Sequence, residues 1–468
     1  KSRPMEPHGL HSSPERGNDS RLYEGERRAP SNYRGRRKQY GAAAQIMCLI
    51  GLVVANITSE AARYSLNFII YPDLAPFLRI TSTQYGFISG LGFGIVYVLC
   101  LIPWGRAADD VKYGRKAVLA AGLVIQVIFT ALQSLAWNFW SLLVIRFGLA
   151  VGQAAITAPA LAIISNVFSE GFWATANGIF TCGIYLGTGL ASFAGIFSFW
   201  FGWEMTFGLF GIFCGVAGLL TVFLIPDEDP EDYELPGGEG WALVRWFSGP
   251  APLLVTLGGC FKFMAGFVTF SFLPIFFQRY VAESVDGSPA ISLWFGLSAA
   301  LGGCAGGVAS GILADALFRG GMAGGPAFVA AVSSILAVPF VFLVAYLPPN
   351  KIWDIIFLVF WYFSAEMWIS PAVAAILQGL LPRHRRAVGL SAYLSICTLA
   401  GALTPLLAGF LVDHGAALKH VIAWIVAPCD LIAAALFVVL GLMLNRSGPP
   451  LPAEEPEDDY YDAEAEAA

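Results

Sequence analysis

Long apolar runs separated by short polar stretches organise nearly the whole chain. Each run has about twenty residues or more, the length that an α-helix needs to cross the hydrocarbon core of a bilayer. The pattern predicts six membrane helices, an acidic cytosolic linker at 226–250, and six further helices. The predicted spans are 42–71, 83–105, 116–136, 138–165, 172–200, 205–225, 251–278, 290–314, 325–346, 351–378, 386–412 and 420–445. The expected fold class is an all-α membrane protein with two six-helix bundles, at 41–225 and 251–446.

The two ends of the chain lack this pattern. Residues 1–40 are rich in Arg, Ser and Pro, and residues 447–468 are acidic, so we expect two disordered tails. Twenty of the 27 Lys and Arg residues fall in the first tail and in the loops on the same side, whereas four fall on the other side. This asymmetry predicts that both termini are cytosolic. It does not distinguish the plasma membrane from an endolysosomal membrane.

The composition agrees with a membrane protein and excludes several other classes. The chain is 57% hydrophobic and only 13% charged, whereas soluble proteins are about a quarter charged. Its eight cysteines all lie in apolar runs, without metal-ligand spacing, and are interpreted as core-filling residues. No phosphate-binding loop or nucleophile motif is present. We therefore expect no enzyme activity, no cofactor or metal, no nucleic-acid partner, and a monomer.

Matching segments recur in the same order in the two halves. "TAPALAII" (157–164) matches "ISPAVAAI" (369–376), "WGRAAD" (104–109) matches "SGILAD" (310–315), and "ANG" (176–178) matches "AVG" (387–389). Internal repeats are a common way of building transporters. The matches predict pseudo-symmetric halves in which Asp109 and Asp315 are equivalent.

The stretch "GRAADDVKYGRK" (105–116) has the form G-x-x-x-D-x-x-x-x-G-R-K between the second and third spans. It resembles the signature loop of the major facilitator superfamily. The resemblance implies that Gly105 permits close helix packing and that Asp109 caps or pairs at a helix end. It also implies that Arg115 and Lys116, after Gly114, lie at the cytosolic surface in a charge latch between the halves.

Two further segments are similar to motifs of the same superfamily. "RFGLAVGQA" (146–154) looks like its fourth-helix motif and places Arg146 inside the membrane. In the fifth span Gly178 and Gly187 have the family's G-x8-G spacing. These glycines would let this helix slide against a helix of the other half.

Within the superfamily the sequence resembles the spinster-type lipid transporters. "RYSLNFIIYPDLAPFLRI" (63–80) is similar to their first helix and its exit. That family has an acidic residue where this chain has Ala62, and usually Glu where it has Gln153. Both carboxylates are linked to proton coupling there, and both are absent here.

Charges within membrane spans are costly and generally functional, and five residues are the candidates for the binding site: Glu60, Arg63, Arg146, Lys262 and Glu366. Glu60 and Arg63 share a helix face and can pair. Aligning Pro72 with Pro274 places Lys262 opposite Glu60. Three alternatives stay open: a bridge that opens and closes, a permanent bridge, or an anionic head group gripped by Arg63 and Lys262.

Glu60 and Glu366 are the two candidates for proton coupling, since a buried carboxyl group can carry a proton. For Glu366, a fixed hydrogen bond to a neighbouring helix is the alternative.

Arg146 is expected to support structure more than to bind substrate. The other residues expected to line the cavity are Tyr64, Asn67, Gln153, Tyr185, Trp361 and Trp368. Asp354, Asp413 and Asp430 are assigned to helix ends and given no buried role.

These features predict a secondary transporter that works by rocker-switch alternating access. The preferred substrate is an amphipathic anion, such as a lysophospholipid or a sphingoid phosphate. A carrier of a small polar solute (a carboxylate, amino acid or sugar) is the first alternative. A sensor that binds without transporting is the second.

Overall fold

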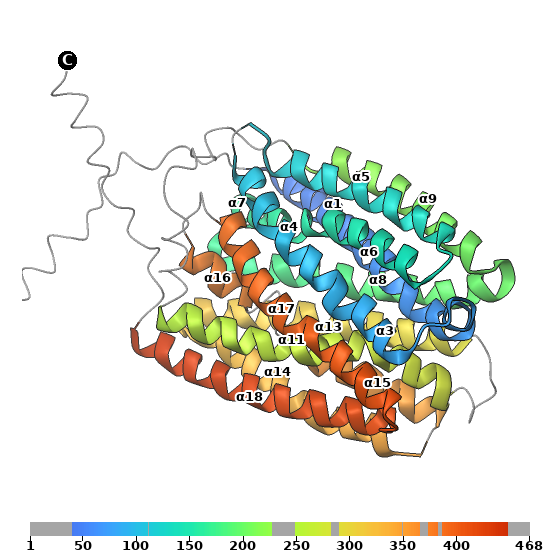
Figure 1. The fold of residues 1–468 in the computed structure, drawn as a ribbon. Helices are drawn as coiled ribbons and strands as arrows, with labels where there is room; N and C mark the ends of the chain where they lie inside the picture. Colours follow the sequence, from blue (N-terminus) through green and yellow to red (C-terminus); the bar gives the residue numbers. More distant parts are fainter. Residues whose placement is uncertain are drawn as a thin grey trace, which may run out of the picture. The chain divides into compact units, whose positions relative to one another are not determined.

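The computed structural model describes residues 40–110, 112–226, 249–281, 290–348, 350–365, 373–381 and 386–447. They belong to one unit, Tyr40–Ala468, and all regular elements in these ranges are helices (Figure 1). Almost all of the predicted linker and tails lies outside the described residues. Two predicted site residues, Glu366 and Trp368, lie outside them as well.

The helices follow the apolar runs. The first half contains α1 (Ala42–Ile69), η2 (Ile70–Leu74), α2 (Ala75–Leu78), α3 (Ser82–Gly86), η3 (Phe87–Leu91), α4 (Gly92–Asp109), α5 (Arg115–Leu132), η4 (Gln133–Leu135), α6 (Phe139–Ala154), α7 (Thr157–Val167), η5 (Glu170–Phe172), α8 (Trp173–Phe201) and α9 (Trp203–Leu224). The second half contains α11 (Pro250–Phe276), η7 (Phe277–Val281), α13 (Ala290–Arg319), α14 (Gly325–Tyr346), α15 (Lys351–Ala365), α16 (Ala375–Leu380), α17 (Arg386–Asp413) and α18 (Leu418–Ser447).

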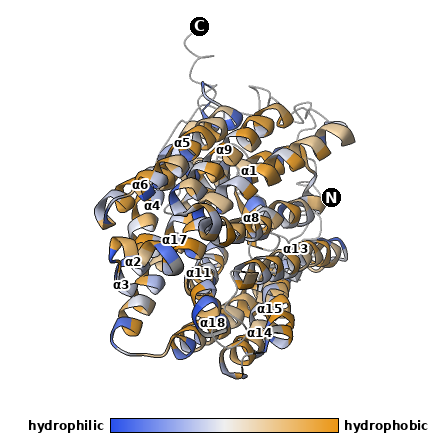
Figure 2. Ribbon diagram, turned by 90° about the vertical axis from the view of Figure 1, so that its right-hand side faces the viewer, coloured by the Kyte–Doolittle hydropathy of each residue, from blue (hydrophilic) through white to orange (hydrophobic). Residues whose placement is uncertain are grey.

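Within the described ranges, eleven helices are long and apolar enough to cross a membrane, and Ile352–Ala365 is a shorter apolar helix. Large apolar side chains such as Leu99, Phe223 and Leu301 are exposed, and hydrophobic residues make up much of the helices in Figure 2. A bilayer is the solvent in which such surfaces are stable. The prediction of a twelve-helix membrane fold is confirmed, and the protein is an integral membrane protein.

The two halves meet along helix pairs with very close backbones. In the first pair α8 packs on α13, and in the second α4 packs on α17. A Cβ atom on Gly178 would lie 2.5 Å from the carbonyl oxygen of Gly307 in the other half. Gly187 has a different neighbour: its Cβ would lie 2.8 Å from the Ile57 carbonyl oxygen of α1, in the same half. The expectation that both glycines face the other half is therefore wrong for Gly187.

Carboxylates at helix ends also join the halves. Asp109, which ends α4, accepts a hydrogen bond from the Val388 N–H at the start of α17 (3.0 Å). Asp315, near the end of α13, accepts from the Ala174 and Thr175 N–H groups at the start of α8 (3.2 and 2.7 Å). The first N–H groups of a helix lack intrahelical partners and carry a partial positive charge, so each carboxylate completes a helix of the other half.

A third carboxylate makes the same contact at the opposite end of the unit. Asp413, which ends α17, accepts from the Ser82 and Thr83 N–H groups at the start of α3 (3.2 and 2.7 Å). The Thr83 hydroxyl also donates to Asp413, at 2.5 Å. Asp413 lies at a helix end, where the sequence placed it, but it connects the halves. We call the two ends of the unit the Asp109 end and the Asp413 end.

Asp413→Ala is expected to loosen the Asp413 end selectively. A charge-assisted hydrogen bond contributes about 1.5–3 kcal/mol, so its loss should speed amide hydrogen exchange at Ser82–Gly86 by about tenfold. Exchange–mass spectrometry measures this. The matched control is Asp354→Ala, because Asp354 accepts from the Asn350 N–H within its own half (2.9 Å). Unchanged exchange at 82–86 in Asp413→Ala would contradict the assignment.

Gly178→Val should destabilise the contact between α8 and α13. The new side chain has no room beside Gly307, and overpacking of this kind costs about 1–3 kcal/mol. A thermal melt of the detergent-purified protein should show a lower midpoint than for Gly208→Val. Gly208 is a fair control since it is also helical and a Cβ there meets nothing within 4 Å. Equal midpoints would show that the contact is dispensable.

Candidate functional site

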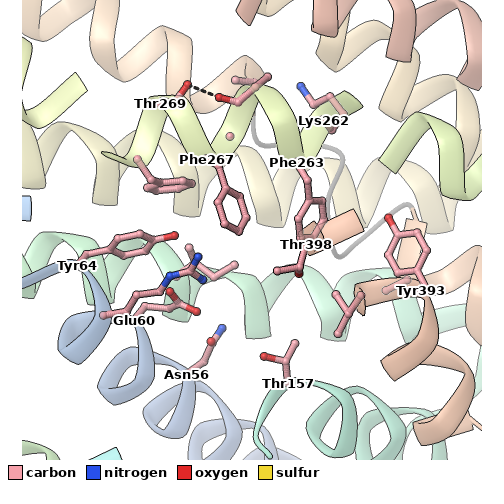
Figure 3. A pocket seen from close by; sticks show the side chains of 18 of the residues that line it. Asn56, Glu60, Tyr64, Thr157, Lys262, Phe263, Phe267, Thr269, Tyr393 and Thr398 are labelled. Carbon is pink, nitrogen blue, oxygen red and sulfur yellow. Dashed lines mark hydrogen bonds between the residues drawn. The ribbon is translucent and has the colours of Figure 1, made fainter. Parts of the chain in front are cut away.

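A cavity of about 130 Å³ lies between the halves, lined from α1, α4, α7, α8, α11, α15, α16, α17 and α18 (Figure 3). Its four charged lining residues are Glu60, Arg63, Lys262 and Asp430. Its aromatic lining residues are Tyr64, Tyr97, Phe180, Phe263, Phe267, Phe270, Trp361 and Tyr393. A mostly apolar wall with a few convergent polar groups is the usual composition of a small-molecule site.

Arg63 lies on α1 among aromatic rings. Its guanidinium carbon is 4.8 Å from the ring centroid of Phe93, 5.0 Å from that of Phe267 and 5.3 Å from that of Tyr64. Ring faces attract a cation at these distances. Within the described part of the chain no carboxylate forms an ion pair with Arg63. A cation held by rings, without a paired acid, has the chemistry to bind an anion.

Glu60 is one turn away on the same helix, and its side chain is 6% exposed. Its Oε1 accepts a hydrogen bond from Gln153 Nε2 at 3.0 Å. Its Oε2 has no hydrogen-bond partner among the described residues. Gln153 stands where spinster-type transporters usually have Glu, and here it binds the carboxylate of Glu60. Gln153 itself does not line the cavity.

The expected pairing of Glu60 with Lys262 is wrong. Lys262 Nζ lies 2.6 Å from Asp430 Oδ1, and the two side chains are 3% and 1% exposed. Repeat symmetry predicts the depth of Lys262, but α11 packs against α18 of its own half, and this turns the ammonium toward Asp430. Asp430 is also not near a helix end, because it is the thirteenth residue of α18 (Leu418–Ser447).

Arg146 lies behind the cavity wall. It is 1% exposed, and its Nη1 donates to the Arg63 carbonyl oxygen at 3.0 Å and to Gln133 Oε1 at 3.4 Å. It borders a separate space of about 10 Å³ together with Asn67. Arg146 thus holds the α1 backbone beside Arg63.

Several residues expected to line the cavity have other positions. Asn67 joins the halves, because its Nδ2 donates to the Phe270 carbonyl oxygen (2.8 Å), and its Oδ1 accepts from Tyr85 of its own half (3.0 Å). Tyr185 is fully buried, with its ring against Phe270. Tyr64 and Trp361 do line the cavity, and Tyr64 stacks on Phe270 with 4.9 Å between ring centroids.

The signature loop has one residue in an unexpected place. Arg115 is not at the surface: it is 1% exposed, and its Nη2 lies 3.0 Å from Asp109 Oδ1. Gly114 has φ +73°, a conformation that favours glycine, and it caps α5. Lys116 is half-buried, and Gly105 is buried in α4. Asp109 therefore has one oxygen for Arg115 and one for the other half.

The cavity also contains polar residues that the sequence interpretation missed, notably Asn56, Thr157, Thr398 and Asp430. Asn56 precedes Glu60 by four residues, so helical spacing could have placed both on one face. Asp430 could have been found by asking which acid neutralises a buried lysine. Thr157 and Thr398 carry no such signal, because threonine is common in membrane helices.

Two pseudo-symmetric helical halves around a central cavity with a few charged groups are the architecture of a membrane transporter, and the chain belongs to the major facilitator superfamily. The model of this family, "Major Facilitator Superfamily", matches residues 52–405. An MFS-type efflux pump of Mycolicibacterium smegmatis is 26% identical over 381 residues, 79% of this chain and 86% of the pump. The 3-(3-hydroxy-phenyl)propionate transporter of Escherichia coli K12 is 26% identical over 290 residues, 60% of this chain and 68% of that transporter.

The fold resembles a solved structure of a spinster-type protein. The crystal structure of a bacterial homologue of the human lysosomal transporter Spinster, inward-facing and unoccupied, superposes with a TM-score of 0.61. The two chains are 20% identical, and the match covers 87% of this chain and 98% of the other. The likeness to spinster-type transporters seen in the sequence is confirmed at the level of the fold.

Proposed function

We propose that this protein is a secondary transporter of a small organic anion with an apolar body. The observation that carries the proposal is Arg63, which lines the cavity, is surrounded by aromatic rings and pairs with no carboxylate in the described residues. Arginine binds a carboxylate through two parallel N–H groups. The rings around it match a flat apolar body, and the relative that transports 3-(3-hydroxy-phenyl)propionate supports this class.

The cavity volume favours a compact substrate. A cavity of about 150 Å³ holds one benzene molecule, and this cavity has about 130 Å³. A single-ring carboxylate matches that volume. A lysophospholipid would need its acyl chain to lie outside the cavity, so the lipid hypothesis stays a prediction, to be compared in the same assay.

Alternating access fits the two sets of helix-end contacts. With both termini in the cytosol, as the Lys and Arg distribution predicts, the Asp109 end faces the cytosol and the Asp413 end faces away from it. Opening to one side then requires the contacts of that end to break while those of the other end persist. Asp109 and Asp315 act as the cytosolic gate in this scheme, and Arg115 positions Asp109.

Glu60 is our candidate for proton coupling. Its Oε2 is buried without a partner among the described residues, as expected for an oxygen that accepts a proton when the substrate arrives. A protonated Glu60 would leave the Arg63 charge for the anion alone. Glu366 stays the second candidate and lies outside the described residues.

Arg63→Ala should abolish uptake of a labelled single-ring carboxylate into proteoliposomes, because the anion loses its cationic partner. The panel contains benzoate, 4-hydroxybenzoate, a sugar acid and an anionic lysolipid. Arg279→Ala is the matched control, since that guanidinium lies over Tyr71, outside the cavity residues. A thermal-shift screen of the same ligands on the wild type and Arg63→Ala separates binding from transport.

Each outcome of this assay has a distinct meaning. Uptake of the lysolipid alone would establish the lipid hypothesis against ours. Ligand stabilisation without any uptake would identify a sensor. Equal uptake by the wild type and Arg63→Ala would remove Arg63 from the site.

Glu60→Gln should abolish uptake driven by an inward proton gradient and spare counterflow exchange of the same substrate. The amide keeps the size of the carboxyl group but carries no titratable proton. Glu204→Gln, an exposed glutamate at the start of α9, is the control. Proton-driven uptake that persists in Glu60→Gln would show that the coupling group lies elsewhere.

A further inference from the structure

We propose that the Lys262–Asp430 pair and the open space beside Gly266 form a second subsite of the cavity, which takes the hydroxyl group of a hydroxylated monocarboxylate and rejects a second carboxylate. The inference rests on the proposed function, in which Arg63 binds the carboxylate. It assigns a specificity role to Asp430, which that function does not use.

The pair lies across the cavity from the first-helix groups. Lys262 is on α11 and Asp430 on α18, whereas Glu60 and Tyr64 are on α1. In Figure 3 the rings of Phe263 and Phe267 separate Lys262 from Glu60 and Tyr64. The cavity therefore has two polar ends joined by aromatic side chains.

Open space adjoins the pair. Gly266 follows Lys262 by one helical turn and lines the same cavity. A Cβ atom built there meets no heavy atom within 4 Å, unlike most glycines of the helix contacts described above. Residues one turn apart lie on one helix face, so this space borders the lysine. A substrate group can occupy it without displacing a packed side chain.

A purely structural role explains the pair poorly. Lys262 and Asp430 belong to the same half, so their bond need not break when the halves move. A buried ion pair is also a weak stabiliser compared with apolar residues of the same volume. What the pair offers a ligand is an ammonium donor and a carboxylate acceptor, side by side at 2.6 Å.

The chemistry of the pair selects one kind of group. A hydroxyl can accept a hydrogen bond from Lys262 and donate one to Asp430 at the same time. A second carboxylate only accepts, and its charge would stand beside that of Asp430, where the low dielectric strengthens repulsion. The wild type should therefore prefer 4-hydroxybenzoate to benzoate, and should exclude terephthalate, which has a carboxylate in place of the hydroxyl.

Asp430→Asn tests the assignment by removing the repelling charge. The ratio of terephthalate to 4-hydroxybenzoate uptake by proteoliposomes should rise at least about tenfold, because one charge repulsion at close range disappears. An unchanged ratio in a folded Asp430→Asn protein would overturn the subsite.

The double variant Lys262→Met/Asp430→Leu should lose the preference for the hydroxyl and gain no terephthalate uptake. A gain of terephthalate uptake would overturn the role of Lys262.

A second variant leaves the ion pair intact. Gly266→Val fills the open space and should lower 4-hydroxybenzoate uptake more than benzoate uptake. Equal losses would overturn the location of the subsite beside Gly266.

Competition experiments on the wild type need no variant. Terephthalate that competes as well as 4-hydroxybenzoate would overturn the proposed rejection of a second carboxylate. A wild type that transports benzoate without preference contradicts only this inference. One that transports none of the three acids contradicts the proposed function and the subsite with it.

Discussion

The contact on which the arrangement of the halves depends is a carboxylate at the end of one helix bound to the first N–H groups of a helix in the other half. Asp109, Asp315 and Asp413 each make it, with near-identical distances for the last two. The interaction combines hydrogen bonding with the positive end of the helix dipole. The donors are backbone N–H groups, so the contact depends little on the side chains of the other half. Only a threonine hydroxyl adds to it, at Asp315 and Asp413.

Between these ends the halves approach through glycines, and this closeness gives the cavity its size. The backbones of α8 and α13 come within reach of each other at Gly178 and Gly307. Larger side chains would separate the halves and widen the central space. The benzene-sized cavity beside Arg63 therefore depends on the small residues that let the two halves pack closely.

The sequence predicts the fold well because hydropathy determines which segments cross the bilayer, and the signature loop identifies the superfamily. It also places Arg63 and Glu60 on the cavity wall, and it gives Arg146 a structural role. The sequence does not predict which acidic side chain pairs with which basic side chain. Symmetry gives the depth of Lys262, whereas the direction of its side chain depends on packing with α18, and Asp430 is 168 residues away. The burial of Arg115 against Asp109 and the packing of Gly187 on α1 are missed for the same reason. Both depend on which residue lies next to them in the fold, and motif spacing does not specify that.

The division of bond types between and within the halves has a consequence for the rate of the conformational change. In the part of the chain that the structure describes, the two ion pairs, Arg115–Asp109 and Lys262–Asp430, each lie within one half. Bonds between the halves near the cavity are neutral, such as Asn67 to the Phe270 carbonyl. Each of these two pairs would therefore move with its own half in the proposed alternating access, and neither has to be separated in a low-dielectric medium. The contacts between the halves that the proposed alternating access has to break include those of Asp109, Asp315 and Asp413 at the helix ends, where water can replace them.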